Sequence, residues 1–478
     1  MSIPVFDQSA IAAFTENSWE TSILPTLCDY IRIPNKSPMF DPDWSASGHM
    51  HRAIRLLDGW TKSLSIPGMT TRIVELPGRT PLLLCEIPGT VESDTCVLLY
   101  GHYDKQPEFD GWEAGLTPWE PVLRDGRLYG RGGADDGYAL FASLTAIAAL
   151  AEQDIPYARC VVLIEGCEES GSFDLPHYVS ALTEEIGHPD LVICLDAECG
   201  NYEQLWTTTS LRGMLPGNLT VRVLEEGQHS GAAGGIVPSS FRILRNLLDR
   251  IEDSTTGALH AALQVDIPAG VRAELERVAQ VLGPEVIHRY PWAGDTRPES
   301  DDTVELLMNN AWRPSLATVG LGGAPSPGNA GNTLRPATTA RLVFRLPPSL
   351  DAATAAAAVK QEFERDPPHG AQVTFEVDTP QTGWCAPGLA AWLEQAQNDA
   401  SQLWFGKPAM RMGMGGTIPF MKMLGESYPG VQFMVTGVLG PKSNAHGPNE
   451  FLEIRTAKRL TGCVALVLAR HAQQHGRQ

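Results

Sequence analysis

Apolar residues are grouped along the first 200 positions in short continuous runs, which alternate with longer segments of helical character. The runs at residues 95–100, 159–164 and 190–195 consist mostly of Val, Leu, Ile and Cys, as expected for strands buried on both faces. Residues 137–153, between the first two runs, are rich in Ala and Leu and predict a helix. This alternation predicts a doubly wound α/β domain with a mostly parallel sheet.

A second pattern begins after about residue 201, where the predicted order becomes strand, helix, strand, strand, helix, strand. This is the order of the split ferredoxin-like motif of an α+β domain. The predicted elements lie at residues 218–224, 237–252, 316–321, 338–346, 352–365 and 372–378. Residues 254–315, between the first helix and the second strand, are punctuated by Pro and charged residues, and we interpret them as an insertion with some helix of its own.

The α/β pattern resumes near the C-terminus, with a predicted helix at residues 388–404 and a strand at residues 431–436. The second domain is therefore expected to be inserted into the first. The expected division is an α/β domain formed by residues 1–208 and 384–478, and an inserted α+β domain formed by residues 209–383.

Composition narrows the class of protein. The 478 residues include 56 acidic and 36 basic side chains, a formal net charge of −20, which repels phosphate backbones and argues against nucleic-acid binding. The longest apolar stretch, residues 138–151, is shorter than the roughly 20 residues that a membrane-spanning helix needs. The N-terminus shows no secretory signal and the nine cysteines form no C-x-x-C pair, and both features favour the reducing cytoplasm.

Polar residues follow each predicted strand of the α/β domain, at the place where open α/β sheets bind their ligands. The sequence there is GHYD at residues 101–104, EGCEESG at residues 165–171 and DAE at residues 196–198. Two further clusters are GRGGADD at residues 130–136, just before the predicted helix, and NAHGPNE at residues 444–450, after the last strand. We expect all five clusters to meet at one edge of the sheet.

The residue types in these clusters are those of a metal site. Imidazole and carboxylate groups without thiolate suit zinc, cobalt or manganese, and two His with three carboxylates can hold two ions when one carboxylate bridges. His102 and Asp104 are two positions apart on extended chain, so Asp104 can accept the second ring N–H of His102. Glu168 and Glu169 are neighbours that face opposite ways, which lets one bind metal while the other carries a proton.

Taken singly, these residues have ordinary structural explanations. A His at the end of a strand, such as His102 or His446, is commonly a hydrogen-bonded structural residue, and Asp135 with Asp136 could form a helix N-cap. Their co-location changes the interpretation, because several negative charges in one crevice are costly unless cations neutralise them. A metal centre is the simplest resolution.

The five clusters resemble, in the same order, the signatures of the dizinc metallopeptidase family that includes carnosinase, cytosolic non-specific dipeptidase, carboxypeptidase G, aminoacylase and acetylornithine deacetylase. The resemblance covers nearly the whole chain. It implies that Glu168 is the general base and that Asp104 orients His102. The metal ligands that it implies are His102 and Asp196 for one ion, Glu169 and His446 for the other, and Asp135 as the bridge between them.

The inserted domain carries a second set of matching residues, and the resemblance implies that it is a lid and dimerisation domain. The stretch that begins QHSG at residue 228 resembles the family segment whose His, here His229, reaches the active site of the partner subunit and helps to stabilise the oxyanion. A homodimer formed through the lid is therefore expected. The substrate-binding residues that the resemblance implies are Asn332, Arg345 for the substrate carboxylate, and the loop residues Gly416 and Thr417 in GGTIP at residues 415–419.

Two departures separate this sequence from the family pattern. The family's D-D-K-G has Gly137 where the lysine would stand, and its N-V-I-P is replaced by N-T-L-R at residues 332–335. Neither change removes a metal ligand, but both alter the surroundings of the substrate pocket.

Together these observations predict a hydrolase that cleaves a peptide-like amide near a free carboxylate, using two divalent metal ions. Zinc is the first choice, with manganese and cobalt as alternatives. The sequence GHYDKQP at residues 101–107 resembles the dipeptidase branch, so dipeptides or short peptides are the expected substrates. An alternative is the removal of an acyl or carbamoyl group from an N-substituted amino acid. A third possibility, a metal-binding protein without catalysis, is argued against by the intact Glu168.

Overall fold

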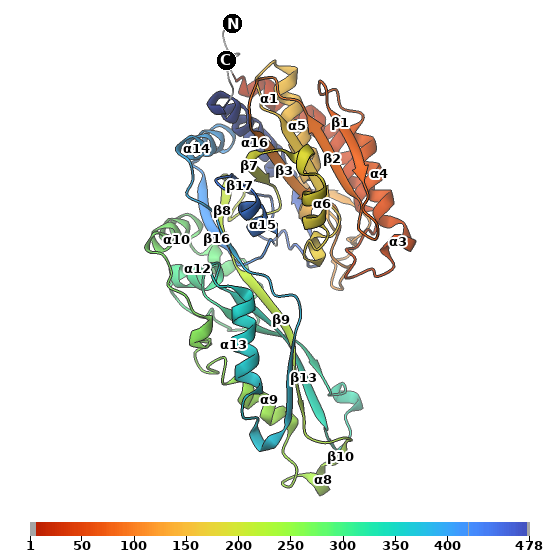
Figure 1. Cartoon of the computed structure of the whole chain (residues 1–478), viewed down its shortest axis with the longest axis vertical. Helices are drawn as coiled ribbons and strands as arrows, with labels where there is room; N and C mark the ends of the chain where they lie inside the picture. The colour runs from red at the N-terminus through yellow and green to blue at the C-terminus, as the bar shows by residue number, and fades with distance from the viewer. Residues whose placement is uncertain (1–5, 419, 476–478) are drawn as a thin grey trace.

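A six-stranded mixed sheet forms the centre of the larger part of the molecule in the computed structural model, which describes residues 6–418 and 420–475 (Figure 1). The strand order across the sheet is β1-β2-β6-β3-β7-β17. β3 pairs in parallel with β6 and β7, β7 pairs in parallel with β17, and β1 and β2 form an antiparallel edge. The strands are β1 Thr70–Val74, β2 Leu82–Ile87, β3 Cys96–His102, β6 Cys160–Glu165, β7 Pro189–Cys194 and β17 Gln432–Val435.

Alternate residues of the central strands contribute to two separate cores on opposite faces of this sheet. Val97 and Leu99 of β3 point into one core, whereas Leu98 and Tyr100 point into the other, as the two-residue period of a strand requires. Both faces are covered, which explains why β3 and β6 are buried at every residue. The predicted α/β fold with a mostly parallel sheet is confirmed, with an antiparallel edge that the sequence pattern did not reveal.

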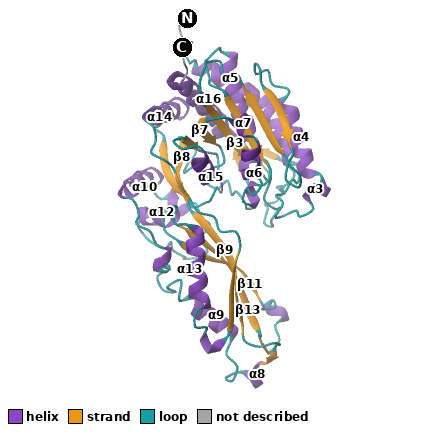
Figure 2. Ribbon diagram, in the orientation of Figure 1, coloured by secondary structure: helices purple, strands orange, loops and turns teal. Residues whose placement is uncertain are grey.

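Helices cover both faces of the sheet, as Figure 2 shows. The first face carries α1 Gln8–Ser18, α2 Leu24–Ile31, α4 His49–Thr61, α5 Ala139–Glu152, α14 Ala391–Phe405 and α16 Ile454–His475. The second face carries α6 Leu175–Ala181, α7 Thr183–Ile186 and α15 Phe420–Ser427. α5 packs between the sheet and α16, so it is apolar all round, as expected for a fully buried helix. The short helix α3 Trp44–Ser47 packs beside α4.

Two small sheets connect the core to the loops around it. The first has the order β15-β8-β16, with β15 Trp384–Cys385, β8 Trp206–Leu211 and β16 Met410–Met414. The second has the order β18-β5-β4, with β18 Phe451–Glu453, β5 Arg127–Tyr129 and β4 Val122–Arg124. Because β5 precedes the GRGGADD segment and β18 follows the NAHGPNE segment, the second sheet brings these two segments together.

A four-stranded antiparallel sheet extends away from the six-stranded sheet (Figure 1). Its strand order is β11-β13-β9-β14, and its elements follow the chain order expected for a ferredoxin-like motif. These elements are β9 Gly213–Arg222, α9 Ser240–Leu248, β11 Ser315–Gly322, β13 Ala337–Leu346, α13 Ala352–Glu364 and β14 Gln372–Val377. Alternate residues of β13 are buried against α9 and α13 in a third core. The predicted ferredoxin-like unit is confirmed.

Residues 254–315 form helices of their own, as expected, but these helices do not extend the ferredoxin-like core. They are α10 Ala269–Leu282, α11 Glu285–His288 and α12 Thr303–Ala311. α10 and α12 pack against β16, and Val278 and Leu282 belong to the same core as Trp206 of β8. The insertion therefore packs against the α/β part of the molecule.

The end of the four-stranded sheet that lies farthest from the six-stranded sheet carries three short elements (Figure 1). These are β10 Gln228–His229, α8 Ser230–Ala233 and β12 Thr333–Leu334, and β10 pairs with β12. Among the described residues, no helix is long and apolar enough to cross a membrane.

Candidate metal centre

The polar clusters predicted from the sequence meet at the carboxyl ends of the parallel strands. His102 is the last residue of β3, Asp196 follows β7, and Glu168 and Glu169 form a helical turn after β6. Asp135 lies in the turn at Gly133–Gly137 that leads into α5. His446 lies in the loop between β17 and β18.

Asp135 contacts a histidine with each of its carboxylate oxygens. Its Oδ1 lies 3.4 Å from Nε2 of His102, and its Oδ2 lies 3.0 Å from Nε2 of His446. Asp196 Oδ1 lies 3.8 Å from the same nitrogen of His102, and Glu169 Oε2 lies 3.2 Å from that of His446. This arrangement has the form of a dinuclear site in which one carboxylate serves two ions.

Potential ligand atoms converge in two groups, each within 4.8 Å. The first group is His102, Glu168 and Asp196, and the second is Asp135, Glu169 and His446. The five metal ligands implied by the family resemblance are thus all present where the two groups meet.

Unsatisfied buried atoms test whether a cation suits this donor set. The side chain of His102 is completely buried, and among the described residues its Nε2 has no hydrogen-bond partner. The Oε1 atom of Glu169 is buried and equally without a partner in the described part of the chain. Burying such atoms unpaired is costly, and imidazole nitrogen with carboxylate oxygen is a donor set that zinc, cobalt and manganese accept. The residues therefore suit divalent metal ions.

Asp104 links the histidine of β3 to the acidic turn after β6. Its Oδ1 lies 3.4 Å from Nδ1 of His102 and accepts the backbone N–H of Glu168 at 3.1 Å. Its Oδ2 accepts the backbone N–H of Glu169 at 3.0 Å. One carboxylate thus orients the His102 ring and holds the turn that presents both glutamates.

Burial and neighbouring charges perturb the acids of the site in different directions. Burial raises the pKa of Glu168 well above its usual value, and the charge of Asp196 adds to the shift. Burial also raises the pKa of Glu169, to about 8. Burial acts in the same sense on Asp135, but the close contacts of its carboxylate with the imidazoles of His102 and His446 outweigh burial and lower the pKa of Asp135. Neighbouring acids whose pKa values are shifted in opposite directions are typical of a functional site.

A buried ion pair holds the Asp135 loop against the His446 loop, and the sequence analysis assigned it no role. Arg131 Nη1 donates to Glu450 Oε2 at 2.7 Å, and Arg131 Nη2 donates to the carbonyl of Gly447 at 2.7 Å. The other oxygen of Glu450 accepts the backbone N–H of Gly132 at 2.9 Å. Both clusters were recognised in the sequence, and the opposite charges within them are the signal that could have predicted the pair.

The structure explains why a lysine is absent after Asp136. A Cβ atom at Gly137 would lie 2.4 Å from Cε1 of Tyr30 and 2.5 Å from the carbonyl of Gly132. The Tyr30 hydroxyl donates to the carbonyl of Tyr103 at 2.7 Å, and the Nζ atom of Lys105 lies 3.9 Å from the centre of the Tyr30 ring. The Tyr30 ring therefore occupies the space that any side chain at position 137 would need.

Two predicted residues of the inserted domain lie together but far from the metal-ligand groups of the same chain. His229 belongs to β10 and Asn332 directly precedes β12, at the end of the four-stranded sheet that lies farthest from the six-stranded sheet (Figure 1). The carbonyl of Asn332 accepts the backbone N–H of Ser230 at 2.8 Å. His229 is exposed, and its Nδ1 accepts the backbone N–H of Gly231 at 3.2 Å.

Arg345 and Thr417 come together where β13 approaches the α/β part. Arg345 Nη1 donates to the Thr417 hydroxyl at 3.2 Å, and this hydroxyl donates to the carbonyl of Arg212 at 2.5 Å. A Cβ atom at Gly416 would meet no atom within 4 Å, so the loop is open beside Thr417. Pro419, which closes the GGTIP segment, lies outside the described residues.

Glu198 lies close enough to three arginines to feel their charges. Burial raises the pKa of Glu198, whereas Arg289, Arg345 and Arg212 act to lower it. Arg289 follows α11 in the 254–315 insertion, so that segment brings positive charge toward the site. Sequence reasoning missed Arg212 and Arg289, because neither lies in a motif.

The sequence of this chain is similar to those of known peptidases. The sequence pattern described as Peptidase family M20/M25/M40 matches residues 98–470. Cysteinylglycine-S-conjugate dipeptidase of Corynebacterium striatum is 26% identical over 363 residues, which cover 75% of this chain and 77% of that protein. Beta-Ala-His dipeptidase of Mus musculus is 27% identical over 294 residues, which cover 59% of this chain and 58% of that protein.

Solved structures share the fold over almost the entire chain. Human carnosine dipeptidase 1 superposes with a TM-score of 0.80 at 21% identity and covers 98% of this chain and 100% of its own. The dipeptidase Dug1p of Saccharomyces cerevisiae superposes with a TM-score of 0.78 at 22% identity and covers 98% of this chain and 99% of its own.

Proposed function

The chain belongs to Peptidase family M20/M25/M40 and is a metallopeptidase, and from that premise we propose that it hydrolyses the amide bond of dipeptides or short peptides at a dinuclear metal centre. The observation that carries the proposal is the contact of Asp135 with both His102 and His446 through opposite carboxylate oxygens. A carboxylate placed between two imidazoles could serve as a ligand to two neighbouring ions, each also bound by one of the histidines.

The proposed ligands divide between two ions, with zinc as the first choice and manganese or cobalt as alternatives. They are His102 and Asp196 for one ion, Glu169 and His446 for the other, and Asp135 for both. When bound, two such ions polarise the scissile carbonyl and lower the pKa of a water molecule towards neutrality.

Glu168 is the proposed general base and acid. Its carboxyl lies beside Asp196, and its pKa is raised by burial and by the charge of Asp196, which favours the protonated form after the carboxylate accepts a proton from the attacking water. The same proton then passes from Glu168 to the nitrogen of the leaving amine. Asp104 has a positioning role, because it fixes the backbone of the turn that carries Glu168.

Arg345 is the proposed partner of the substrate's free carboxylate. A guanidinium group can donate two parallel hydrogen bonds to a carboxylate, and Thr417 already holds one arm of Arg345 at 3.2 Å. The open backbone at Gly416 leaves room beside this pair for the peptide. A requirement for a free carboxylate suits dipeptides, in agreement with the names of the relatives.

The inserted domain, residues 209–383 against residues 1–208 and 384–478, is proposed to be a lid through which two copies dimerise. The edge strand β11 supports this, because within the described residues it pairs only with β13 and exposes Val319 by 61% and Leu321 by 53%. An exposed apolar edge strand is a template for pairing with a second chain. His229 and Asn332 would then reach the site of the partner subunit, where His229 can donate a hydrogen bond to the substrate oxyanion.

Ultracentrifugation of the Val319→Lys variant tests the dimer. We expect a dimeric wild type and a shift of this variant toward monomer, because a charge on the edge opposes strand pairing. Val281→Lys, at another exposed valine, is the matched control and should stay dimeric. A wild type that is monomeric and fully active would contradict the lid proposal.

We also propose a cytoplasmic location, supported by nine cysteines that are all free thiols in the structure.

Product analysis tests the substrate class. The purified protein, supplied in turn with zinc, manganese or cobalt, is incubated with dipeptides, N-acetyl amino acids and N-carbamoyl amino acids. Cleavage of dipeptides at rates well above those of the acylated compounds is the expected result. Preferential release of acetate or carbamate would establish the deacylase alternative, and no cleavage of any amide would leave a metal-binding protein without catalysis.

A further inference from the structure

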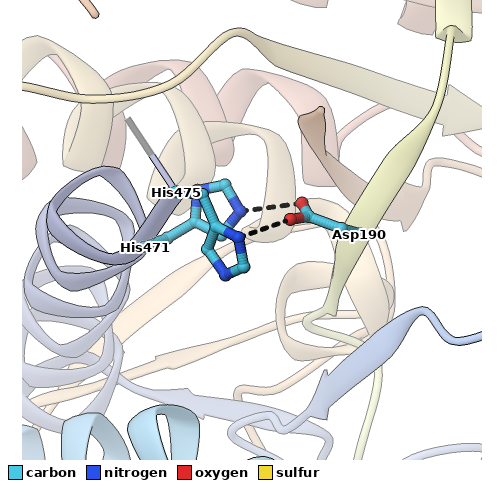
Figure 3. A group of neighbouring side chains, drawn as sticks. All are labelled: Asp190, His471 and His475. Carbon is cyan, nitrogen blue, oxygen red and sulfur yellow. Dashed lines mark hydrogen bonds and ion pairs between the residues drawn. The ribbon is translucent and has the colours of Figure 1, made fainter. Parts of the chain in front are cut away.

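A third group of potential metal ligands lies at the opposite end of β7 from the two groups of the candidate metal centre. Asp190 is the second residue of β7, whereas Asp196 lies just beyond the carboxyl end of the strand. At about 3.3 Å per residue, the two positions are roughly 20 Å apart along the chain. His471 and His475, near the end of α16, face Asp190 (Figure 3). This group is therefore separate from the proposed catalytic centre.

Both histidines contact the same carboxylate. The Nε2 atom of His471 lies 2.8 Å from Asp190 Oδ1, and the Nδ1 atom of His475 lies 3.3 Å from Asp190 Oδ2 (Figure 3). The two rings stack with centroids 4.8 Å apart, because residues four apart lie on one face of a helix. One potential ligand atom from each residue lies within 4.8 Å of the others.

These distances suit a tetrahedral ion. Zinc binds nitrogen and oxygen ligands at about 2.0–2.2 Å, which places neighbouring ligand atoms roughly 3.3 Å apart. Two histidines one helical turn apart and a carboxylate from another element form a zinc donor set that leaves a fourth position open.

The surroundings leave the three side chains available for an ion. His471 is fully buried, and its Nδ1 has no hydrogen-bond partner among the described residues; the same holds for Nε2 of His475. The Trp392 ring packs edge-to-face with both imidazoles. Among the described residues, neither ring therefore has a hydrogen-bond partner other than Asp190.

Among the described residues, the carboxylate of the cluster has no charged partner apart from the two histidines. The side chain of Asp190 is only 22% exposed, and its other hydrogen bond comes from the Thr95 hydroxyl at 2.9 Å. No Lys or Arg within residues 6–418 and 420–475 forms an ion pair with it, and the neighbouring Arg470 is paired with Asp399.

We propose that Asp190, His471 and His475 bind one divalent transition-metal ion, with zinc as the ion best suited to these donors, at a site distinct from the catalytic centre. The ion joins the last turns of α16 to the first residues of β7. Its role is structural, because it fastens the C-terminal helix to the edge of the sheet opposite the active site.

Zinc content measured on the full chain tests this site. Wild type and the His475→Gln variant are stripped with a chelator, saturated with zinc, freed of unbound metal by gel filtration and analysed by elemental mass spectrometry. We expect His475→Gln to hold one zinc ion fewer per chain than wild type. The comparison is a difference, so it does not depend on how many ions the catalytic centre holds. Gln474→Ala, on the exposed side of the same turn, is the matched control and should retain the wild-type content.

A second readout separates loss of the site from loss of folding. His475 lies near the chain end and is 32% exposed, so circular dichroism of the metal-free variant should match that of wild type. Ions that bind only the folded state raise its melting temperature, so added zinc should raise the melting temperature of His475→Gln less than that of wild type. Equal zinc content together with equal zinc-induced stabilisation in the two proteins would overturn the proposal.

Discussion

The Nε2 atom of His446 lies 3.0 Å from Oδ2 of Asp135, although the two residues are 311 positions apart in the sequence. Neither loop is part of the six-stranded sheet. Their contact depends on the pairing of β5 with β18 and on the ion pair between Arg131 and Glu450. The metal centre is thus assembled by a buried polar link between two loops that are remote in sequence.

Removal of this link should destabilise the protein severely. Glu450→Gln leaves the Arg131 guanidinium buried without its charge partner, which typically costs about 3–5 kcal/mol. Urea unfolding of metal-free protein should show this loss, and the variant should also bind metal more weakly because the Asp135 loop is released. Glu225→Gln breaks an exposed pair with Arg222 and should change stability by less than about 1 kcal/mol. A Glu450→Gln variant as stable as the Glu225→Gln control would refute the role of the link.

Introducing the family lysine at position 137 should harm this protein rather than improve it. In Gly137→Lys and in Gly137→Ala the new Cβ collides with Tyr30 and with the Gly132 carbonyl, so a loss of at least about 1–3 kcal/mol is expected. Gly137→Ala should cost less in a Tyr30→Ala background than in wild type, because the contact with the ring is then absent and only the contact with the Gly132 carbonyl remains. Thermal unfolding of the single variants and of the double variant measures these losses. If Gly137→Ala melts at the wild-type temperature, the steric explanation is wrong.

The buried Glu165 should make stability fall as the pH rises. Burial and the charge of Asp104 raise the pKa of Glu165 to about 7, against about 4.3 in an unfolded chain. Between these values the folded state binds more protons than the unfolded state, so the free energy of unfolding decreases with rising pH, by about 4 kcal/mol in total.

Glu165→Gln isolates this contribution to stability. The amide oxygen can still accept from the Tyr100 and Ser172 hydroxyls, which donate to Glu165 at 2.6 and 2.8 Å, but it carries no titrating proton. Urea unfolding with chelator present should show that the free energy of unfolding of Glu165→Gln increases relative to that of wild type from pH 5 to pH 8. Parallel pH profiles for the two proteins would show that the carboxyl does not titrate in this range.

Arg345→Ala should impair the binding of substrates that carry a free carboxylate. Loss of a charge-assisted hydrogen bond of this kind costs about 1.5–3 kcal/mol, which corresponds to a fall of roughly tenfold to hundredfold in kcat/KM. An amidated dipeptide lacks this charge, so the variant and wild type should hydrolyse it with similar kcat/KM. The control Arg341→Ala removes an arginine of the same strand that pairs with Asp378 instead. Equal losses on free and amidated dipeptides would contradict the assignment.

The sequence was sufficient to predict the candidate site residues that directly follow a strand. His102, Glu168 and Asp196 follow continuous apolar runs, so the general rule that ligands collect at strand ends was enough to group them. The antiparallel edge β1-β2 was missed, because short apolar runs alone do not reveal strand direction.

Residues that depend on long-range packing could not be predicted in the same way. Glu450 and Arg131 meet only after β5 and β18 pair, and Arg289 reaches Glu198 only because the insertion packs on the α/β part. His471 and His475 have a visible four-residue spacing. Their partner Asp190 lies at the start of a strand, and only the fold places it opposite α16.

The central claim, that Glu168 transfers protons at a dinuclear metal centre, is tested most directly by Glu168→Gln. Metal content and dipeptide hydrolysis are measured on the same preparations after chelation and after separate addition of zinc, manganese or cobalt, with the exposed Glu184→Gln as the control. We predict wild-type metal content with kcat lowered at least a hundredfold in Glu168→Gln, and wild-type values for the control. A Glu168→Gln variant that binds metal and hydrolyses dipeptides at the wild-type rate would contradict the account.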